Sequence, residues 1–315
     1  MAGGKLMQFV VLRNPSSSKN RAGKTKPYPS NIKPIDLTGI AALPALLTDL
    51  HRDGVECIVI DGGDGTVREV LSYLPNIYGA DLPFIGILPH GNTNLIARNT
   101  GALHSPASLL KIEDLPAQED AAIMRKMPML RLDFDLAQHP PLRGFMMGWG
   151  AFARATQFAI EENTSSGPFQ VLNVFFKMLK SAFLQGRKGV MRQGIPADLT
   201  IDENPTQQGH RFIGLVTTLK GTLVAGLNPF WGKGDGAIRW TDVLAPAPHL
   251  VPATLIAITG RCMKWMERRG YHSGHAEKLD LIIDTPLVLD GELIPFDQKQ
   301  KISISAQEKV YFISI

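Results

Sequence analysis

Three repeats of one pattern dominate the first 130 residues: a short apolar run, a polar or glycine-containing turn, and then a helical pattern. The apolar runs are 9–12, 56–60 and 83–89, and we interpret each as a strand. Strands that alternate with helices in this way are typical of a mostly parallel sheet. The N-terminal part is therefore predicted to be an α/β domain.

The helical patterns differ in how clearly they are bounded. The clearest has four apolar residues at the i, i+3, i+4, i+7 spacing of a single buried face: Val67, Val70, Leu71 and Leu74. Pro75 predicts its end, because a proline inside a helix removes a hydrogen bond. Residues 37–50 predict an earlier helix, in which Pro44 marks an alternative start. The polar stretch 14–34 is predicted to be a loop, and a third, short helix is expected to end near Gly101.

The second part of the chain has a different sequence pattern. Five apolar runs are separated by Gly, Pro and Asp and predict a mainly antiparallel, β-rich domain: 130–134, 212–219, 255–258, 279–283 and 301–305. The predicted domains are thus residues 1–129 and 130–305. Residues 306–315 form a last strand that is a candidate to return to the first domain.

One helical pattern, 171–184, interrupts the β-rich part. It carries Lys177 and Lys180 opposite an apolar face, and Arg187 and Lys188 follow it, so it is our candidate for contact with an anionic bilayer. A helix packed on the sheet of the second domain is an alternative with at least equal support.

Composition excludes several classes of protein. A net charge of +4, from 33 basic and 29 acidic residues, falls short of a nucleic-acid-binding signature, so no nucleic acid partner is expected. Cys57 and Cys262 have no paired spacing for a zinc site or a disulfide framework, which favours a reducing, cytoplasmic location. Neither a signal peptide nor an apolar run of about 20 residues is visible, so membrane contact is expected to be peripheral, at the inner membrane surface.

The turn after the second strand is the strongest signal of chemistry. Gly62, Gly63 and Gly65 lie where a strand ends and a helix begins. Because glycine has no Cβ atom, backbone N–H groups can approach phosphate oxygens closely, and the helix offers its positive end to the same anion. The spacing matches neither the P-loop nor the dinucleotide motif. The alternative is a tight turn that uses glycine only for its backbone conformation.

Asp64 is the unusual residue of this turn, because a carboxylate beside a phosphate is repulsive unless a cation intervenes. Mg²⁺ would resolve the conflict, with Asp64 as its ligand or as the base that orients an attacking hydroxyl. Alternatively, Asp64 caps the helix through its side-chain oxygen, a role also open to Thr66.

A second polar turn, 89–94, follows the next strand. Gly91, Asn92, Thr93 and Asn94 place small polar groups at another helix start, and both turns should lie outside the carboxyl ends of the strands, where ligands of open α/β sheets bind. His90 is interpreted as structural, because no second metal ligand is spaced to pair with it.

Four motifs together resemble the diacylglycerol kinase catalytic-domain family, which includes bacterial lipid kinases and the sphingosine and ceramide kinases. Residues 14–17 (Asn-Pro-Ser-Ser) are similar to its opening turn, 62–66 to its Gly-Gly-Asp-Gly-Thr loop, 89–94 to its Pro-x-Gly-Thr-x-Asn turn, and 290–292 to its Asp-Gly-Glu element. Their order and spacing agree over nearly the whole chain.

The resemblance implies a two-domain kinase, with a nucleotide domain like that of NAD kinases and phosphofructokinases, a β-rich lipid domain, and an active site between them. It implies ATP contacts at Asn14, Thr38, Gly62, Gly63, Asp64, Gly65, Thr66, Val67, Arg68, Gly91, Asn92, Thr93 and Asn94. Glu292 resembles the proton acceptor, and Asp235 resembles an acidic element near a Mg²⁺ site. For Glu292 the alternative is a hairpin turn residue, because Asp-Gly is a strong hairpin signal.

Three departures from the family pattern stand out: Asn92 replaces Thr or Ser, Leu95 replaces an Asp, and Arg68 replaces the common Asn. Arg68 either tunes nucleotide choice or pairs with Glu69 or Asp64. The sequence thus predicts an ATP- and Mg²⁺-dependent lipid kinase that phosphorylates a hydroxyl of diacylglycerol or a sphingoid lipid, with Glu292 or Asp64 as the base. An NAD kinase-like enzyme and a non-catalytic regulator are the alternatives. The acceptor lipid and the oligomeric state, a homodimer included, stay open.

Overall fold

The computed structural model describes residues 7–113, 115, 123–135, 140–161, 192–223 and 226–315. The chain divides into two compact units: unit 1 is 1–127 with 309–315, and unit 2 is 128–308. The predicted helix 171–184, with Lys177, Lys180, Arg187 and Lys188, lies outside the described residues.

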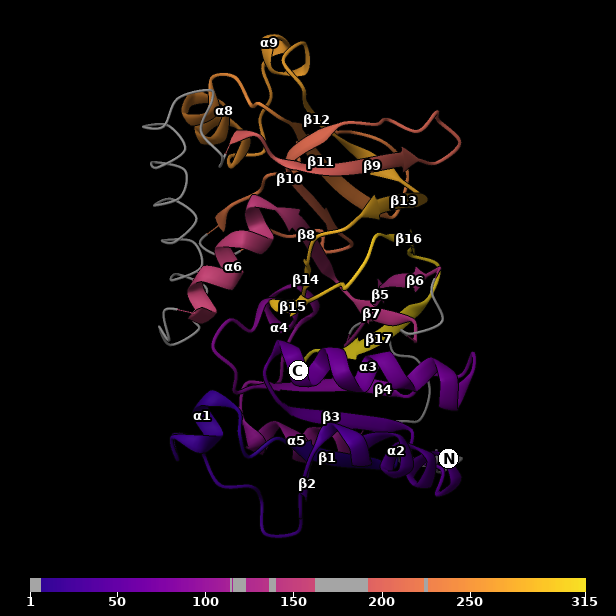
Figure 1. The fold of residues 1–315 in the computed structure, drawn as a ribbon. Coiled ribbons are helices and arrows are strands. Elements are labelled where there is room, and N and C mark those ends of the chain that lie inside the picture. The colour runs from indigo at the N-terminus through magenta and orange to yellow at the C-terminus, as the bar shows by residue number, and fades with distance from the viewer. Residues whose placement is uncertain (1–6, 114, 116–122, 136–139, 162–191, 224–225) are drawn as a thin grey trace. The chain divides into compact units, whose positions relative to one another are not determined.

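Unit 1 is built on a six-stranded sheet in the order β2-β1-β3-β4-β17-β5 (Figure 1). The strands are β1 (Phe9–Arg13), β2 (Ile35–Asp36), β3 (Cys57–Gly62), β4 (Phe84–Pro89), β5 (Met124–Pro128) and β17 (Lys309–Ile313). Neighbours from β2 to β17 pair in parallel, which confirms the predicted α/β class and three predicted strands. The end of the chain therefore supplies a strand to the first sheet.

Helices lie on both faces of this sheet (Figure 1). They are α1 (Ser18–Arg21), α2 (Leu43–Arg52), α3 (Asp64–Tyr78), α4 (Leu95–Thr100) and α5 (Leu109–Glu113), with the 3₁₀ turns η1 (Ile40–Ala42) and η2 (Pro106–Ser108). On one face, Cys57 and Val59 of β3 pack in a cluster with Leu109 and Ile112 of α5. Because strand side chains alternate, the other residues of β3 face the side that α3 covers.

Two helix boundaries were predicted from prolines, and the structure supports one of them. The prediction that Pro75 ends its helix is wrong: α3 continues to Tyr78 and ends at Gly79, whose φ is 65° and whose N–H donates to the carbonyl of Pro75. One missing hydrogen bond did not outweigh the packing of the buried face. The alternative start at Pro44 is confirmed, since α2 begins at Leu43, and the predicted loop 14–34 contains the short helix α1.

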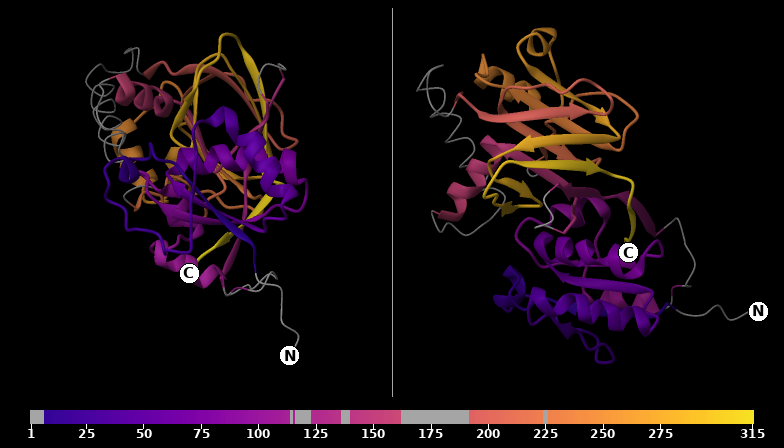
Figure 2. Two further views of the ribbon diagram at one scale, coloured as in Figure 1. Left: turned by 90° about the horizontal axis from the view of Figure 1, so that it is seen from below. Right: turned by 45° about the vertical axis from the view of Figure 1, so that its right-hand side comes forward.

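Unit 2 is an antiparallel, β-rich unit, as predicted, with the strand order β15-β14-β8-β10-β9-β13-β16-β6-β7, and with β11 beside β10 and β12 beside β11 (Figure 2). Its strands are β6 (Leu130–Phe134), β7 (Leu142–Gly144), β8 (Met146–Gly150), β9 (Ile195–Ile201), β10 (His210–Thr217), β11 (Ile238–Leu244), β12 (Tyr271–Ala276), β13 (Lys278–Ile283), β14 (Leu287–Leu289), β15 (Glu292–Ile294) and β16 (Gln300–Ser305). Alternate residues of these strands, such as Leu279, Leu281 and Ile283, form its core.

Three described helices accompany this sheet: α6 (Ala151–Glu161), α8 (Leu250–Ala257) and α9 (Lys264–Glu267). The prediction of a strand at 255–258 is wrong, because most of this run belongs to α8. Four apolar residues carry no readable period, so such a run cannot be assigned to strand or helix from its own sequence. Among the described residues, none of the helices has the length and apolar character of a membrane span.

Candidate functional site

Two glycine turns meet at the carboxyl ends of β3 and β4. Gly62 of β3 is paired with Pro89 of β4, so the turns that follow are neighbours. A Cβ atom on Gly91 would lie 2.4 Å from the Cα atom of Gly63, and one on Gly63 would lie 3.0 Å from the Cα atom of Gly91. The two turns therefore touch backbone to backbone, and side chains are excluded from their contact.

The N-terminal end of α3 opens at this junction. The first intrahelical hydrogen bond runs from the N–H of Val67 to the carbonyl of Gly63, at 3.1 Å. By helix geometry, the preceding N–H groups, of Asp64, Gly65 and Thr66, have no partner within the helix. The N-cap residue is Gly63, which has no side chain to cap them. This end of α3 therefore has the donors and the dipole direction that fit a phosphate.

Asn14 joins the end of β1 to the same turn. Its Nδ2 donates to Oγ1 of Thr66 at 2.8 Å, and its Oδ1 accepts the N–H of Ser16 at 2.9 Å. The structure thus brings Asn14, a predicted nucleotide contact, onto the glycine turn. Thr38, another predicted contact, is exposed just beyond β2 at the same edge of the sheet.

Asp64 caps a helix, but not its own. Its two carboxylate oxygens accept the N–H groups of Leu95, at 2.9 Å, and Ile96, at 3.0 Å, in the first turn of α4. Burial raises the pKa of Asp64, while these hydrogen bonds and the charge of Arg98 act in the opposite direction. The carboxylate therefore ties the first turn to the second. Its predicted role as base or metal ligand stays a prediction.

The second turn is closed by Asn94. Its Oδ1 accepts the N–H of Gly91 and its Nδ2 donates to the carbonyl of Gly91, both at 3.0 Å. Asn94 has a left-handed backbone with φ of 50°, which asparagine tolerates. Asn92 is exposed and Thr93 partly exposed, so these two present side chains of the turn to solvent.

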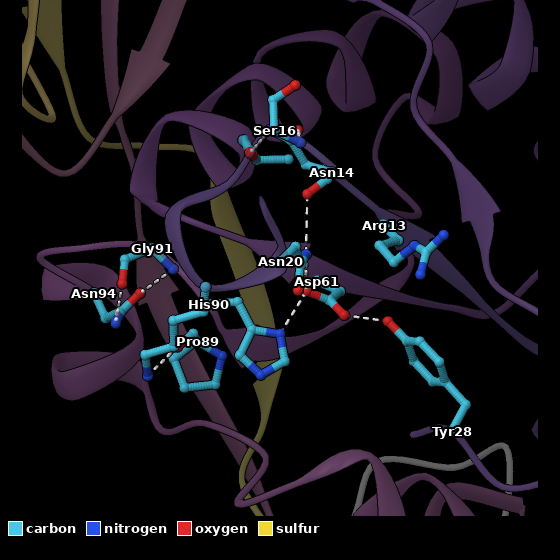
Figure 3. Close-up of polar contacts among 12 residues, drawn as sticks. Arg13, Asn14, Ser16, Asn20, Tyr28, Asp61, Pro89, His90, Gly91 and Asn94 are labelled. Atoms are coloured by element: carbon cyan, nitrogen blue, oxygen red, sulfur yellow. Dashed lines mark hydrogen bonds and ion pairs between the residues drawn. The ribbon is translucent and has the colours of Figure 1, made fainter. Parts of the chain in front are cut away.

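A buried carboxylate, Asp61, connects the turns to the segment between β1 and β2 (Figure 3). Its side chain is 1% exposed, and Oδ1 lies 2.7 Å from both Nδ2 of Asn20 and Nδ1 of His90. The Tyr28 hydroxyl donates to Oδ2. Burial acts to raise the pKa of Asp61, but the three hydrogen bonds outweigh it and hold the pKa below its usual value.

The sequence patterns did not predict this network, although a carboxylate at the end of an apolar run, Asp61, was a usable signal. Its partners Asn20 and Tyr28 lie within the predicted loop, where no sequence pattern distinguishes them from their neighbours. His90 was interpreted as structural, and the structure gives it the role of holding its turn against Asp61.

Val67 and Arg68 point away from solvent. Val67 is 1% exposed, and its N–H is bonded to Gly63. Arg68 is 3% exposed and forms an ion pair with Glu69, one of the partners considered for it. Direct nucleotide contact by these two side chains stays a prediction, and their observed contacts favour a packing role.

In unit 2, Asp290 and Gly291 form a two-residue turn between β14 and β15, in which Leu289 is paired with Glu292. Their φ angles are 48° and 91°, the positive values that a tight hairpin turn requires. The carboxylate of Asp290 accepts the N–H groups of Phe145 and Met146. The predicted Asp-Gly hairpin turn is therefore present, while Glu292 is exposed at the start of β15 and its role as proton acceptor stays a prediction.

The described residues contain no group of three His, Cys, Asp or Glu side chains that could hold a metal. Mg²⁺ that arrives with a nucleotide needs only one or two carboxylates besides the phosphates. Both oxygens of Asp64 already accept backbone hydrogen bonds, and Asp235 is exposed in the loop before β11. A magnesium contact at Asp235 stays a prediction.

Comparison with known proteins agrees with this geometry. Residues 8–124 match the family model described as the diacylglycerol kinase catalytic domain. "Lipid kinase YegS" of Escherichia coli K12 is 39% identical over 64 residues, which is 20% of this chain and 21% of that protein. "Probable lipid kinase YegS-like" of Citrobacter koseri is 39% identical over 59 residues, 19% of this chain and 20% of that protein. The matched segments thus span about a fifth of these relatives.

Solved structures extend the likeness to the whole fold. A crystal structure of a diacylglycerol kinase from Bacillus anthracis str. Sterne has a TM-score of 0.59 and 13% identity, and the match covers 99% of this chain and 98% of that one. At this identity the likeness concerns the fold alone. Over the glycine turns the similarity is to the diacylglycerol kinase catalytic domain, whose family model matches residues 8–124 of this chain.

Proposed function

We propose that the protein is an ATP-dependent lipid kinase, which transfers the γ-phosphate to a hydroxyl of diacylglycerol or a related sphingoid lipid. The observation that carries the proposal is the open N-terminal end of α3 beside the contact of Gly63 with Gly91. The family match over the same residues supports a kinase, and similarity to proteins named lipid kinases supports a lipid acceptor.

In this proposal the first turn of α3 binds the phosphates of ATP through the N–H groups of Asp64, Gly65 and Thr66. Asn14 and the network of Asp61 keep the surrounding segments in place, so that the turn is formed before the nucleotide arrives. Mg²⁺ would neutralise the charge that develops on the phosphate oxygens. The protein would otherwise act by positioning the two reactants, which can itself lower the activation barrier substantially.

Glu292 is the proposed proton acceptor. It is exposed at the start of β15, and the tight turn before it, anchored by Asp290, fixes its backbone. Asp64 is the weaker candidate, because both of its oxygens accept backbone hydrogen bonds. We assign Asp64 to positioning α4 and the second turn.

The test is the transfer of labelled γ-phosphate from ATP, with Mg²⁺, to diacylglycerol, sphingosine, ceramide and phosphatidylglycerol, beside NAD and a reaction without acceptor. The proposal expects a labelled lipid, at least a hundredfold less of it for Glu292→Gln, and a smaller loss for Asp64→Asn. Label in NAD alone would replace it with the NAD kinase alternative. Nucleotide binding without label in any acceptor would support the non-catalytic regulator instead.

A membrane lipid as substrate also implies a location in the cell. We propose that the protein acts in the cytoplasm, at the inner membrane surface, through peripheral contact. Fractionation of cells that express the tagged chain tests this, with the expectation that part of the protein sediments with membranes and is released by salt, as for a surface attraction.

A further inference from the structure

Helix α8 is uncharged and apolar, yet part of it is exposed. Its sequence, Leu-Val-Pro-Ala-Thr-Leu-Ile-Ala, contains no charged residue. Leu250, Ala253 and Ala257 are buried, yet Leu255 is 57% exposed and Pro252 is exposed as well. A helix that is apolar on all sides is normally buried. Part of α8 therefore exposes apolar surface that the described residues of unit 2 do not cover.

The segment that follows α8 also exposes an apolar side chain. Met263 is 53% exposed, just before α9. On the inner side, Met266 of α9 belongs to the same buried cluster as Leu250 and Ala257 of α8, so both helices pack on one core. Figures 1 and 2 show α8 and α9 at the same end of unit 2. Leu255 and Met263 are two of the six large apolar side chains that the described part of the chain exposes most.

Exposed basic residues follow α8 in the same segment. Four exposed basic residues lie within nine positions: Arg261, Lys264, Arg268 and Arg269. Glu267 is the single acidic residue between 250 and 270, so this segment carries a net charge of +3. Basic residues thus follow the apolar helix directly along the chain.

Apolar side chains flanked by Lys and Arg fit the boundary of an anionic bilayer. The apolar groups enter the acyl region, while long basic side chains keep their charged ends at the phosphates. Negative lipids attract such cations over about a Debye length, roughly 8 Å at physiological salt. A soluble acidic protein would match the cations but gain less from the exposed apolar residues Leu255 and Pro252.

We propose that residues 250–269, the α8–α9 surface, dock unit 2 on an anionic phospholipid bilayer. The proposal rests on the proposed lipid kinase function, for which the substrate lies in a membrane. It names a contact surface inside the described residues, separate from the predicted helix 171–184.

The experiment measures flotation of the full chain with vesicles, without nucleotide, so that kinase activity plays no part. The vesicles are phosphatidylcholine alone or a mixture of phosphatidylcholine and phosphatidylglycerol. Wild-type protein should float with the mixed vesicles, and much less with the neutral ones. The double variants Leu255→Gln with Met263→Gln and Arg268→Gln with Arg269→Gln should each bind about tenfold more weakly. Ile40→Gln is the matched control, because Ile40 is 56% exposed but lies in unit 1.

Two further measurements separate the outcomes. Each variant is checked for its thermal transition, and its phosphorylation of lipid in detergent micelles should equal that of wild type, because micelles remove the need for a bilayer. Equal vesicle binding by wild type and both double variants would overturn the proposal. So would a dimer that the Leu255 and Met263 changes dissociate, since the apolar surface would then join two copies. Vesicle binding that depends on this surface, with no lipid phosphorylation by wild type, would leave the surface standing and reject the kinase function.

Discussion

Two aspartates, one in each unit, are equally buried but differently surrounded. Asp61 in unit 1 and Asp242 in unit 2 are both 1% exposed. Asp61 accepts hydrogen bonds from three side chains that belong to two separate segments, and its pKa is lowered. Asp242 lies 3.2 Å from Nε of Arg211 without hydrogen-bond geometry, and burial raises its pKa to about 6.

The difference shows that donors, rather than burial, decide the charge of a buried carboxylate. The donors of Asp61 come from the β1–β2 segment and from the turn after β4, so its charge orders the segments around the glycine turn. Asp242 lies inside a sheet, on β11 between β10 and β12, away from the glycine turns of unit 1. We therefore expect Asp61 to matter for binding and Asp242 only for stability.

The largest effect is expected for Asp61→Ala, which leaves the Tyr28, Asn20 and His90 groups without their acceptor. Leaving buried donors unsatisfied costs about 1 to 3 kcal/mol each, so the free energy of unfolding should fall by about 4 kcal/mol. Affinity for Mg²⁺-ATP should fall with it. Urea unfolding and calorimetric titration measure the two quantities. Asp242→Ala is the control, for which binding of nucleotide by the folded protein should be unchanged; a similar loss of binding in both variants would remove the contrast.

The two aspartates should also give opposite dependences on pH. The lowered pKa of Asp61 contributes stability above the unfolded pKa, and this contribution is lost as pH falls through the folded pKa. The raised pKa of Asp242 contributes stability below the unfolded value of 3.8, and this is lost as pH rises through about 6.

Between pH 4 and pH 7, Asp242 should therefore remove up to about 3 kcal/mol from the free energy of unfolding. Urea unfolding over this range should show a shallower decline for Asp242→Asn than for wild type. Asp61→Asn should instead remove part of the loss at acid pH. Parallel pH curves for wild type and Asp242→Asn would mean that Arg211 keeps the Asp242 carboxylate ionised throughout.

A further contrast concerns glycines at the two ends of the first sheet. Gly91→Ala places a Cβ atom against the backbone of Gly63, which cannot move aside as a flexible side chain could, so we expect a loss of about 2 kcal/mol of stability and about tenfold weaker Mg²⁺-ATP binding. Gly54→Ala is the control. Gly54 has φ of 73° but no neighbour within 4 Å, so it should lose about 1 kcal/mol of stability and keep its affinity. Unchanged affinity in Gly91→Ala would place the nucleotide elsewhere.

Local patterns in the sequence were sufficient to predict the strand, glycine turn and helix that make the proposed phosphate site. The apolar spacing of Val67 to Leu74 depends only on neighbours along the chain, and so does the hairpin turn at Asp290. The contacts of Asp61 could not be predicted, because Tyr28 and Asn20 reach it across 33 and 41 positions. The same holds for Asp64, whose carboxylate caps a helix 31 residues further on.

The smallest predicted effect tests the partly exposed edge of the same site. Thr66→Val keeps the shape of the side chain but removes the oxygen that accepts the hydrogen bond of Asn14. Because this bond is half-exposed and water can replace the lost acceptor, unfolding should become easier by about 1 kcal/mol, well below the effect of Asp61→Ala. Thr66→Ser, which retains the hydroxyl, should restore most of this stability. A loss of unfolding free energy for Thr66→Val as large as that for Asp61→Ala would contradict this prediction. It would mean that the hydrogen bond of Asn14, rather than the buried donors around Asp61, keeps the glycine turn ordered.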